Sequence, residues 1–552
     1  MARRRRKKRS PIPVIILLAV VAVITFAAVK LYPQISESSA SADLSDYFGV
    51  SDGQAALVVN DEILEAKGVV RDDQIYIDYD TVATYFNDRF CWDESTEQML
   101  ITLPSGTETF TDGDGSLVLI DGEPWLSADC ISENSDIDFA VYSSPDRVVA
   151  RTEWDNIPTE TVTQDSKVRT SGSKKGETLT TVSAGDTVVL TQNDDAWCQV
   201  STEDGFIGYI EKSSLETGDE LTHTPDPSFS YSKISLDEKI NMGWQYTETD
   251  DGISNLATLT NGTGVNVVSP TWFTVTDKKG TVNSLAGSDY VEQAHNSGIS
   301  VWGCFQDVAD DDGVSADDYL QTEDVRQKII SSLIQYATDV GMDGINLDIE
   351  TVTEENVRYY LQFIRELCQA AHEENLIVSV DNYTSTYTQY LNRAEQAEVA
   401  DYLVIMGYDE HTAGSEEAGS VASLPFVEQG ITDLLDEGVD ASQIINGIPF
   451  YSRGWTYTSG GGVPTSETLA MGDQQSWADS HGIELSWDSS LGQYTGSVTT
   501  DDGTTYSIWI EDDKSIEEKM KLIEKYDLAG VAEWRLGLED AGVWEVINNH
   551  LQ

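Results

Sequence analysis

The sequence has few basic residues beyond its first ten positions. It holds 33 Lys and Arg against 96 Asp and Glu, a formal net charge of −63, and seven of the basic residues fall within Arg3–Arg9. A body of this sign repels phosphate backbones, so we expect no nucleic-acid partner. The composition is otherwise that of a folded protein, because 9% aromatic residues suffice for sizeable cores.

Several kinds of site are also absent from the sequence. The five cysteines show no CxxC spacing, which excludes a zinc framework or a dithiol redox site. Gly460–Gly462 is not followed by Lys-Ser/Thr, and Asp310–Gly313 lacks the spacing of a calcium loop. No GxSxG elbow is present. We therefore expect no metal and no cofactor. The cysteines are Cys91, Cys130, Cys198, Cys304 and Cys368; burial as small apolar residues is favoured, and a Cys91–Cys130 pair stays open.

The N-terminus has the pattern of a membrane anchor. The cationic block Arg3–Arg9 precedes Ile12–Val29, eighteen residues without a charge, and about 20 apolar residues span a bilayer as a helix. Basic residues before the span predict a cytoplasmic tail over 1–10, a transmembrane helix over 11–32 and an extracellular body. A cleaved signal peptide is the alternative, but the small-x-small site Ala40–Ala42 lies far beyond the apolar run.

Two small β domains are predicted next. Short alternating apolar runs separated by Asp-Gly turns predict strands across 51–155 and again across 160–216. Polar linkers over 33–50 and 217–233 flank them. The chain from 234 to 552 has a different pattern, in which apolar strand-like runs alternate with amphipathic helices.

Both β domains carry weak resemblances. Val59–Asp61, Trp92-Asp93 and Ile101 resemble the N-terminal module of copper amine oxidases, which implies a stalk-like spacer. The second domain resembles a bacterial Src-homology-3-type barrel in a set of short matches: Val168-Arg169, Gly185-Asp186, Trp197 and Gly208–Ile210. That family commonly contacts cell-wall material. Whether Trp197 and Tyr209 serve the core of the barrel or contact a wall polymer stays open.

The C-terminal region predicts an α/β fold, a (β/α)8 barrel. Strands that alternate with helices imply right-handed βαβ units and a parallel sheet. A Gly-rich, partly strand-like stretch, Trp455–Ile510, reads as an α+β insertion before the last strand. The eight predicted strands are Ile240–Trp244, Val265–Val268, Ile299–Phe305, Gly344–Ile349, Ile377–Val380, Tyr402–Met406, Ile444–Pro449 and Ala529–Trp534.

The fourth predicted strand ends in a row of polar residues. Side chains alternate along a strand, so Asn346, Asp348 and Glu350 share the face toward the barrel interior. They lie at the carboxyl end of the strand, where barrel enzymes place their active sites. Two buried carboxyls side by side raise the pKa of one of them, which suits a general acid. Asp343 is out of phase with this row and is interpreted as structural.

Four ordered motifs resemble glycoside hydrolase family 18, in its spore-cortex-lytic, YaaH-like branch. Asp343–Glu350 looks like the DGxDxDxE signature, and Met406–Asp409 resembles MxYD. Gly530–Arg535 carries Trp534 where that family has its floor tryptophan, and Val267–Phe273 also matches. The resemblance covers about 234–552.

The resemblance implies substrate-assisted, retaining hydrolysis, in which the acetamido group of the sugar replaces an enzyme nucleophile. Glu350 is the expected acid, Asp348 holds the acetamido N–H and Tyr408 donates to its carbonyl. Met406, Asp409 and Trp534 are expected to contact the same sugar. Asn346 is included among the substrate-binding residues, although the family usually has a carboxylate there.

We therefore predict a membrane-anchored glycosidase that faces outward and cleaves β-1,4 bonds after N-acetylglucosamine in peptidoglycan. Chitin or its oligosaccharides is the alternative substrate. A non-hydrolytic, glycan-binding lectin on the same barrel is the alternative class, and Asn346 keeps it open, while retention of Glu350 favours the enzyme.

Overall fold

The computed structural model describes residues 37–247, 256–307, 313–384, 386–458 and 462–551. Contacts between Cα atoms divide the chain into two compact units. The N-terminal unit runs to Asp88 and resumes over Thr111–Asp226, and the barrel unit consists of Arg89–Phe110 and Pro227–Gln552. The predicted transmembrane helix over 11–32 lies outside the described residues. Among the helices that the structure describes, none is both long and apolar enough to span a bilayer.

The N-terminal unit contains two antiparallel-rich sheets. One has the order β7-β8-β3-β2-β1-β10-β9 and the other β13-β12-β16-β15-β14-β11-β17. Phe48, Val58, Val168 and Phe206 belong to one buried cluster, so the two sheets share a core. The strands are β1 (Gln54–Val59), β2 (Glu62–Arg71), β3 (Gln74–Asp78), β7 (Leu117–Ile120), β8 (Glu123–Ser127), β9 (Asp138–Tyr142), β10 (Arg147–Arg151), β11 (Thr159–Val162), β12 (Ser166–Arg169), β13 (Thr178–Val182), β14 (Thr187–Asn193), β15 (Trp197–Ser201), β16 (Ile207–Glu211) and β17 (Leu215–Thr217).

The barrel unit is built on eight parallel strands, which confirms the predicted barrel. Their order is β18-β31-β25-β24-β23-β22-β21-β19, and a further pairing of β18 with β19 closes the ring. Each predicted strand corresponds to one of them. The bounds are β18 (Ile240–Gln245), β19 (Val267–Val275), β21 (Ser300–Asp307), β22 (Gly344–Ile349), β23 (Ile377–Tyr383), β24 (Tyr402–Met406), β25 (Ile444–Pro449) and β31 (Gly530–Trp534).

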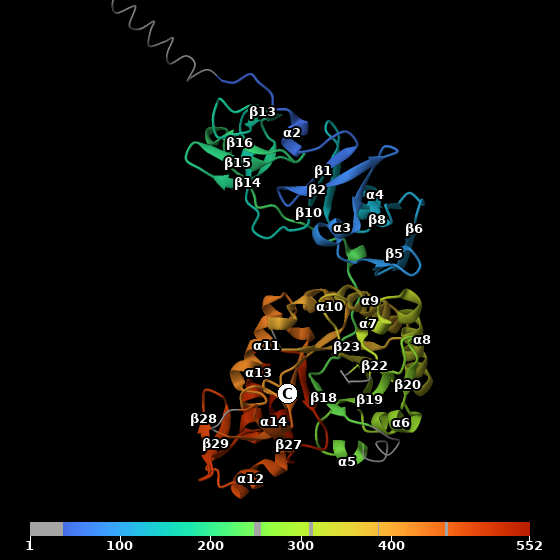
Figure 1. Ribbon diagram of the computed structural model, residues 1–552, viewed down its shortest axis with the longest axis vertical. Helices are drawn as coiled ribbons and strands as arrows, with labels where there is room; N and C mark the ends of the chain where they lie inside the picture. The colour runs from blue at the N-terminus through green and yellow to red at the C-terminus, as the bar shows by residue number, and fades with distance from the viewer. Residues whose placement is uncertain (1–36, 248–255, 308–312, 385, 459–461, 552) are drawn as a thin grey trace, which may run out of the picture. The chain divides into compact units, whose positions relative to one another are not determined.

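Helices surround the strands (Figure 1). In α9, apolar residues at helical spacing, such as Leu361, Ile364 and Cys368, are buried in the layer between helix and barrel. Helix α8 ends at Gly341, whose positive φ of 79° suits a residue without a Cβ. The helices include α6 (Ser288–Asn296), α8 (Glu323–Val340), α9 (Val357–Glu373), α10 (Arg393–Val399), α11 (Leu424–Asp436), α13 (Asp513–Tyr526) and α14 (Val543–His550).

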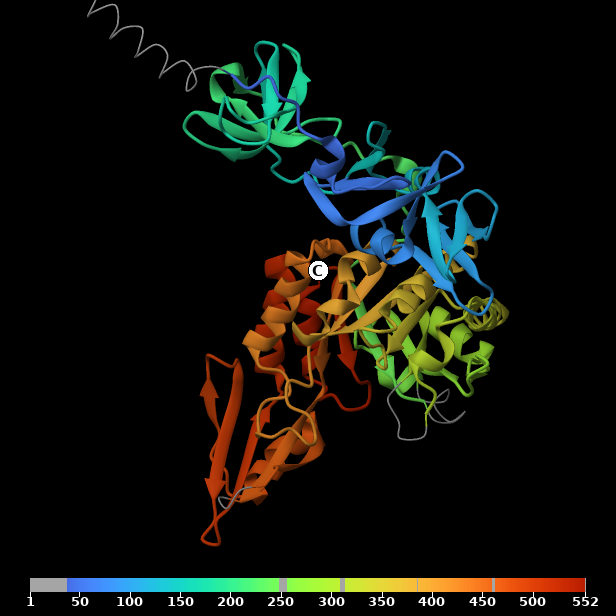
Figure 2. The same cartoon turned by 45° about the horizontal axis from the view of Figure 1, so that its top comes forward.

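An α+β insertion separates the seventh and eighth barrel strands. Its five-stranded sheet has the order β27-β26-β30-β29-β28, and α12 (Met471–Ser480) packs on it. Figure 2 shows this sheet extending from the barrel in the orange and red part of the chain. Its strands are β26 (Tyr451–Thr458), β27 (Thr465–Ala470), β28 (Ser486–Asp488), β29 (Gln493–Thr499) and β30 (Thr504–Ile510).

The predicted β-rich domain over 51–155 does not fold as one body. Its strands β4 (Phe90–Asp93), β5 (Gln98–Leu103) and β6 (Gly106–Thr111) form a separate sheet, which belongs to the barrel unit. The Gln362 amide on α9 donates to the Thr102 hydroxyl, and the Glu323 amide at the start of α8 donates to Asp93. Because it packs on these two helices, the sheet belongs to the barrel unit, although its position in the sequence suggests the N-terminal unit.

All five cysteines are buried and unpaired. The possible Cys91–Cys130 disulfide is not formed, and the two residues belong to different units. Burial as small apolar side chains is the role that the structure gives them.

Candidate active site

The inner face of β22 lies at the centre of the site. The Asn346 side chain meets residues of three other strands inside the barrel, while Ile345 and Leu347 on the opposite face are buried toward the helices. Asp348 is 7% exposed and Glu350 follows the strand directly. Strand alternation thus aims two carboxyls at one end of the barrel.

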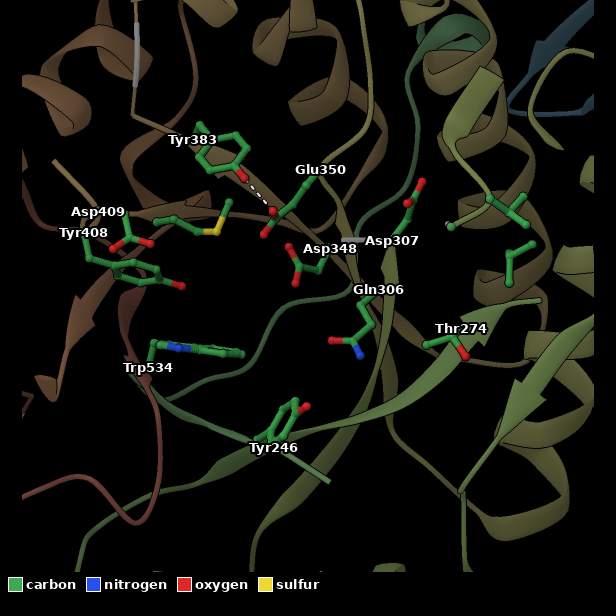
Figure 3. A pocket seen from close by; sticks show the side chains of 14 residues that line it. Tyr246, Thr274, Gln306, Asp307, Asp348, Glu350, Tyr383, Tyr408, Asp409 and Trp534 are labelled. Carbon is green, nitrogen blue, oxygen red and sulfur yellow. Dashed lines mark hydrogen bonds between the residues drawn. The ribbon is translucent and has the colours of Figure 1, made fainter. Parts of the chain in front are cut away.

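A cavity of about 690 Å³ opens at this end of the barrel. Figure 3 shows Glu350, Asp348, Tyr408 and Asp409 along one side of this space, with the ring of Trp534 seen edge-on beneath them. The cavity is lined by Tyr246, Thr274, Val275, Gln306, Asp307, Gly313, Val314, Asp348, Glu350, Tyr383, Met406, Tyr408, Asp409 and Trp534. Six of the seven residues predicted for the site therefore line one cavity.

Glu350 is held by a tyrosine. The Tyr383 hydroxyl donates to Glu350 Oε2 over 2.6 Å (Figure 3). Burial raises the pKa of Glu350; the Tyr383 hydrogen bond lowers it, and Asp409 and Asp307 raise it further, so the net pKa lies above the usual range. A carboxyl that keeps its proton toward neutral pH can protonate a leaving group.

Asp348 is more enclosed than Glu350. Its Oδ1 atom has no hydrogen-bond partner among the described residues. Burial, and then the charges of Glu350 and Asp307, raise the pKa of Asp348 to about 8. An unpartnered buried carboxyl oxygen is costly. The oxygen itself is buried, and the residue that carries it lines the cavity.

Aromatic rings form the floor. Trp244 packs edge-on against Trp534, with ring centroids 5.9 Å apart, and against Tyr408 at 6.4 Å. At Gly407 a Cβ would lie 2.4 Å from the carbonyl oxygen of Gly447, so the residue before Tyr408 must be glycine for β24 and β25 to approach. These contacts fix the floor beneath the carboxyls.

Asp409 is fixed by the insertion. The Tyr451 hydroxyl on β26 donates to Asp409 Oδ1 over 2.6 Å, and the Arg453 guanidinium lies 3.5 Å from the same oxygen. The insertion therefore contributes to the site through Asp409.

Asn346 differs from the prediction. It is fully buried and is not among the residues that line the cavity. Its Oδ1 accepts from Trp244 Nε1 and the Ser269 hydroxyl, and its Nδ2 donates to the Ser379 hydroxyl and to Asp381 Oδ1. Both N–H groups are thus used away from Asp348, so Asn346 supports the floor and is not placed to touch a ligand.

Sequence reasoning missed several acidic and polar neighbours. Tyr383 and Asp381 lie on the inner face of β23, two residues apart, and Asp307 ends β21. Burial raises the pKa of Asp307, whose carboxylate accepts from the Tyr319 hydroxyl. The sequence contains a signal for Asp381 and Tyr383. The alternation that selects Asp348 and Glu350 also runs through β23, once that strand is extended beyond Val380. Asp343, by contrast, accepts from the Val301 amide and pairs with His295, away from the cavity.

The arrangement suits cleavage of a glycosidic bond. Carboxyls with raised pKa line a cavity that also has aromatic faces, on which sugar C–H groups stack. In the described part of the chain, no group of three or more His, Cys, Asp or Glu is arranged to hold a metal ion.

Comparisons with known proteins agree with this geometry. The chain is 25% identical over 282 residues to the uncharacterized glycosylase YvbX of Bacillus subtilis, which covers 49% of this chain and 80% of that protein. It is 26% identical over 242 residues to the cortical fragment-lytic enzyme of Bacillus subtilis, covering 42% of this chain and 54% of the relative.

Solved structures share the barrel fold. The C-terminal domain of a putative chitinase from Desulfitobacterium hafniense aligns with a TM-score of 0.52 at 22% identity, over 57% of this chain and all of that one. The spore cortex-lytic enzyme SleL of Bacillus cereus aligns at 0.51 and 19% identity, over 61% of this chain and 78% of that one.

Two family models match within the chain. Residues 165–216 match the bacterial SH3 domain, and residues 309–539 match glycosyl hydrolases family 18, the segment that contains Asp348, Glu350, Tyr408 and Trp534. The chain therefore contains a family 18 glycoside hydrolase domain, matched over 309–539, and a bacterial SH3 domain, matched over 165–216.

Proposed function

We propose that this enzyme is anchored in the cell membrane, faces outward and hydrolyses β-1,4 bonds after N-acetylglucosamine in peptidoglycan. The observation that carries the proposal is the unpartnered Oδ1 of Asp348 beside Glu350 in the cavity above Trp534. An acetamido N–H supplies the donor that this oxygen lacks, so the site favours a 2-acetamido sugar over plain glucose.

The proposed reaction uses Glu350 and Asp348 in different protonation states. Glu350 donates its proton to the glycosidic oxygen as the bond to the anomeric carbon breaks. The acetamido carbonyl oxygen attacks that carbon and forms an oxazolinium ion, whose positive charge the Asp348 carboxylate stabilises. Water then adds to the same carbon with Glu350 as the base, so the configuration is retained. Tyr408 donates to the acetamido carbonyl, and Trp534 stacks beneath the ring.

Two features favour peptidoglycan over chitin. The bacterial SH3 domain supports a cell-wall polymer as the substrate. In addition, the Arg535 guanidinium lies over the ring of Tyr246, a residue that lines the cavity, 5.4 Å from its centroid, and no described carboxylate forms an ion pair with it. A cation without a carboxylate partner among the described residues suits the carboxylate of a muramyl unit, which chitin lacks.

The activity is tested on the full chain in mild detergent. Purified peptidoglycan and chitin oligomers are incubated with the enzyme and with Glu350→Gln, and new ends are identified by mass spectrometry. Reducing N-acetylglucosamine ends from peptidoglycan, absent in the variant, support the proposal. If fragments are released from chitin alone, chitin is the substrate. If the chain binds either glycan without cleaving it, the alternative of a non-hydrolytic lectin is favoured.

Arg535→Gln sharpens the substrate assignment. We expect kcat/KM on peptidoglycan to fall by about tenfold, the effect of losing one charge-assisted contact, with chitin oligomers cleaved at an unchanged rate. An equal loss on both substrates would assign Arg535 to the support of Tyr246 instead.

The anchor is tested separately. Deletion of residues 1–32 is expected to release the enzyme from washed membranes, and protease added to intact cells is expected to digest the body of the anchored chain. Retention of the deleted chain in the membrane fraction would contradict the anchor and leave the glycosidase proposal unaffected.

A further inference from the structure

Asn346 holds Asp381, a buried carboxyl on the strand next to the one that carries Asp348. Asp381 lies on the inner face of β23, which pairs in parallel with β22, and Asn346 is opposite Ser379 in that pairing. The Asn346 Nδ2 atom donates to Asp381 Oδ1 over 2.7 Å, and its other N–H goes to the Ser379 hydroxyl. The amide oxygen accepts from Trp244 and Ser269, so the amide cannot turn over without losing these bonds.

Asp381 is a buried acid that the proposed reaction does not use. It is 5% exposed and is not among the residues that line the cavity. In the family pattern the second carboxyl of the site stands at position 346. In this chain an amide stands there, and a carboxyl stands 2.7 Å away on the next strand. The base of the site thus has the same number of acids as in the family pattern, but in this chain one of them lies on β23 instead of at position 346.

Among the described residues, no cation contributes to the electrostatics of Asp381. The titratable groups that interact with it come from several elements: Asp348 and Glu350 on β22 and after it, Cys304 on β21, Tyr360 on α9 and Tyr408 after β24. All of them are acids, which favours the neutral form of Asp381.

We propose that Asp381 is a positioning residue that keeps its proton while Asp348 gives up its own, so that the pair carries a single negative charge on the carboxyl that faces the sugar. The inference deepens the proposed function, because it rests on Asp348 acting as a carboxylate. Asn346 acts on Asp381 alone: by donating to Asp381 Oδ1 it fixes that oxygen as an acceptor and leaves the proton for Oδ2.

Electrostatics supports this order of ionisation. Burial and the charge of Asp348 raise the pKa of Asp381 well above its usual range, despite the opposing hydrogen bond from Asn346. Asp348 lines the cavity, where a ligand N–H would stabilise its charged form, and Asp381 is not among the residues that line it. Asp348 therefore loses its proton first.

A swap of amide and carboxyl tests the inference through pH profiles of kcat/KM. Asp381→Asn resembles the neutral acid, so we expect activity near neutral pH within about twofold of the parent. Asn346→Asp adds a charge beside Asp348, raises its pKa and moves the acidic limb up by about one unit, with a tenfold loss per unit. The double variant restores one amide and one carboxyl, and its limb returns to the parental position.

Two controls separate charge from structure. Ser379→Ala removes the other acceptor of Asn346 without a change of charge, and we expect its acidic limb to stay in place. Asp348→Asn serves as the reference for loss of the required carboxylate. If Asp381→Asn loses as much activity as Asp348→Asn at every pH, or if the double variant is no better than Asn346→Asp, the inference is overturned.

Infrared difference spectra give a readout that needs no turnover. The parent minus Asp381→Asn at neutral pH is expected to contain the C=O stretch of a protonated carboxyl. A difference that contains only carboxylate bands would overturn the inference. Because this measurement uses no glycan, it decides the state of Asp381 even if the chain cleaves neither substrate and the proposed function fails.

Discussion

Two groups of buried acids in the barrel unit have opposite surroundings. In the outer helical layer, Glu366 forms a two-pronged ion pair with Arg326 at 3.0 Å, and both side chains are at most 1% exposed. Glu395 is bound by both Arg365 and Arg89. In the interior, Asp348 and Glu350 have no cation among the described residues that interact with them. The same residue type is neutralised where it holds helices together and left unpaired at the cavity.

The pKa directions express the difference. Burial raises the pKa of Glu395, but Arg365 and Arg89 outweigh it and leave the pKa below its usual range. Burial of Asp348 is reinforced by other acids, and its pKa rises to about 8. Acids of the second kind weaken the fold near neutral pH, since the unfolded chain holds them as carboxylates without this penalty. Their presence points to chemistry rather than to stability.

Glu350→Gln has the largest expected effect, and we expect it to lower activity without lowering stability. Loss of the general acid is expected to lower kcat by about 10³-fold or more, while the melting temperature holds or rises because an unpaired buried acid is removed. Rates on peptidoglycan fragments and thermal unfolding measure the two quantities. A marked fall in melting temperature would place Glu350 with the structural acids instead.

Arg326→Met is expected to lower stability, because it removes the cation that neutralises a buried acid of the helical layer. Glu366 would be left buried without its partner, and we expect a loss of about 3–5 kcal/mol in the free energy of unfolding. Urea unfolding of the full chain, followed through the barrel unit, measures it. The matched control is Arg326→Met with Glu366→Leu, which removes both charges and should recover most of the loss. Equal instability of both variants would show that packing, not charge, dominates there.

Tyr383→Phe removes the hydrogen bond that Glu350 accepts inside the site. The Tyr383 hydrogen bond lowers the pKa of Glu350, so its removal raises that pKa, and the alkaline limb of the pH–rate profile moves to higher pH. We expect kcat to fall by about tenfold or less, the size of one hydrogen bond to a charged group. A limb that moves to lower pH would contradict the assignment of Glu350 as the proton donor.

Lys521→Ala has the smallest expected effect. Lys521 pairs with Glu517 and Glu518 on the exposed face of α13, where the side chains are 31–48% exposed. The free energy of unfolding should change by less than about 0.5 kcal/mol. Urea unfolding beside Arg326→Met gives the contrast, and a loss as large as that of the buried pair would remove the distinction between the two kinds of ion pair.

Local periodicity was sufficient to predict the barrel and the core of the site. Alternation in β22 gave the inward position of Asp348 and Glu350, and strand ends placed Tyr408 and Trp534 at the same cavity. It also placed Asn346 inward, but the depth of that residue depends on Trp244, Ser269 and two groups of β23.

The rest depends on contacts between distant parts of the chain. Tyr383 was missed because its strand was ended at Val380, before the residues that reach the cavity. Strands β4–β6 belong to the barrel unit, unlike the strands next to them in the sequence. Hydrogen bonds to α8 and α9 hold them there across more than 200 positions, such as the one from Gln362 to Thr102. The roles of the catalytic residues and the membrane anchor stay predictions for the experiments above.

The place of β4–β6 has a consequence for the order of synthesis. Phe90 and Ile101, fully buried in the finished protein, leave the ribosome long before α9 exists to cover them. At roughly 5–20 residues per second, the chain from Thr111 to Glu373 takes on the order of tens of seconds to follow. During that time the nascent sheet exposes an apolar face. The buried face of β4–β6 is therefore completed only after residues more than 200 positions later in the chain have been made.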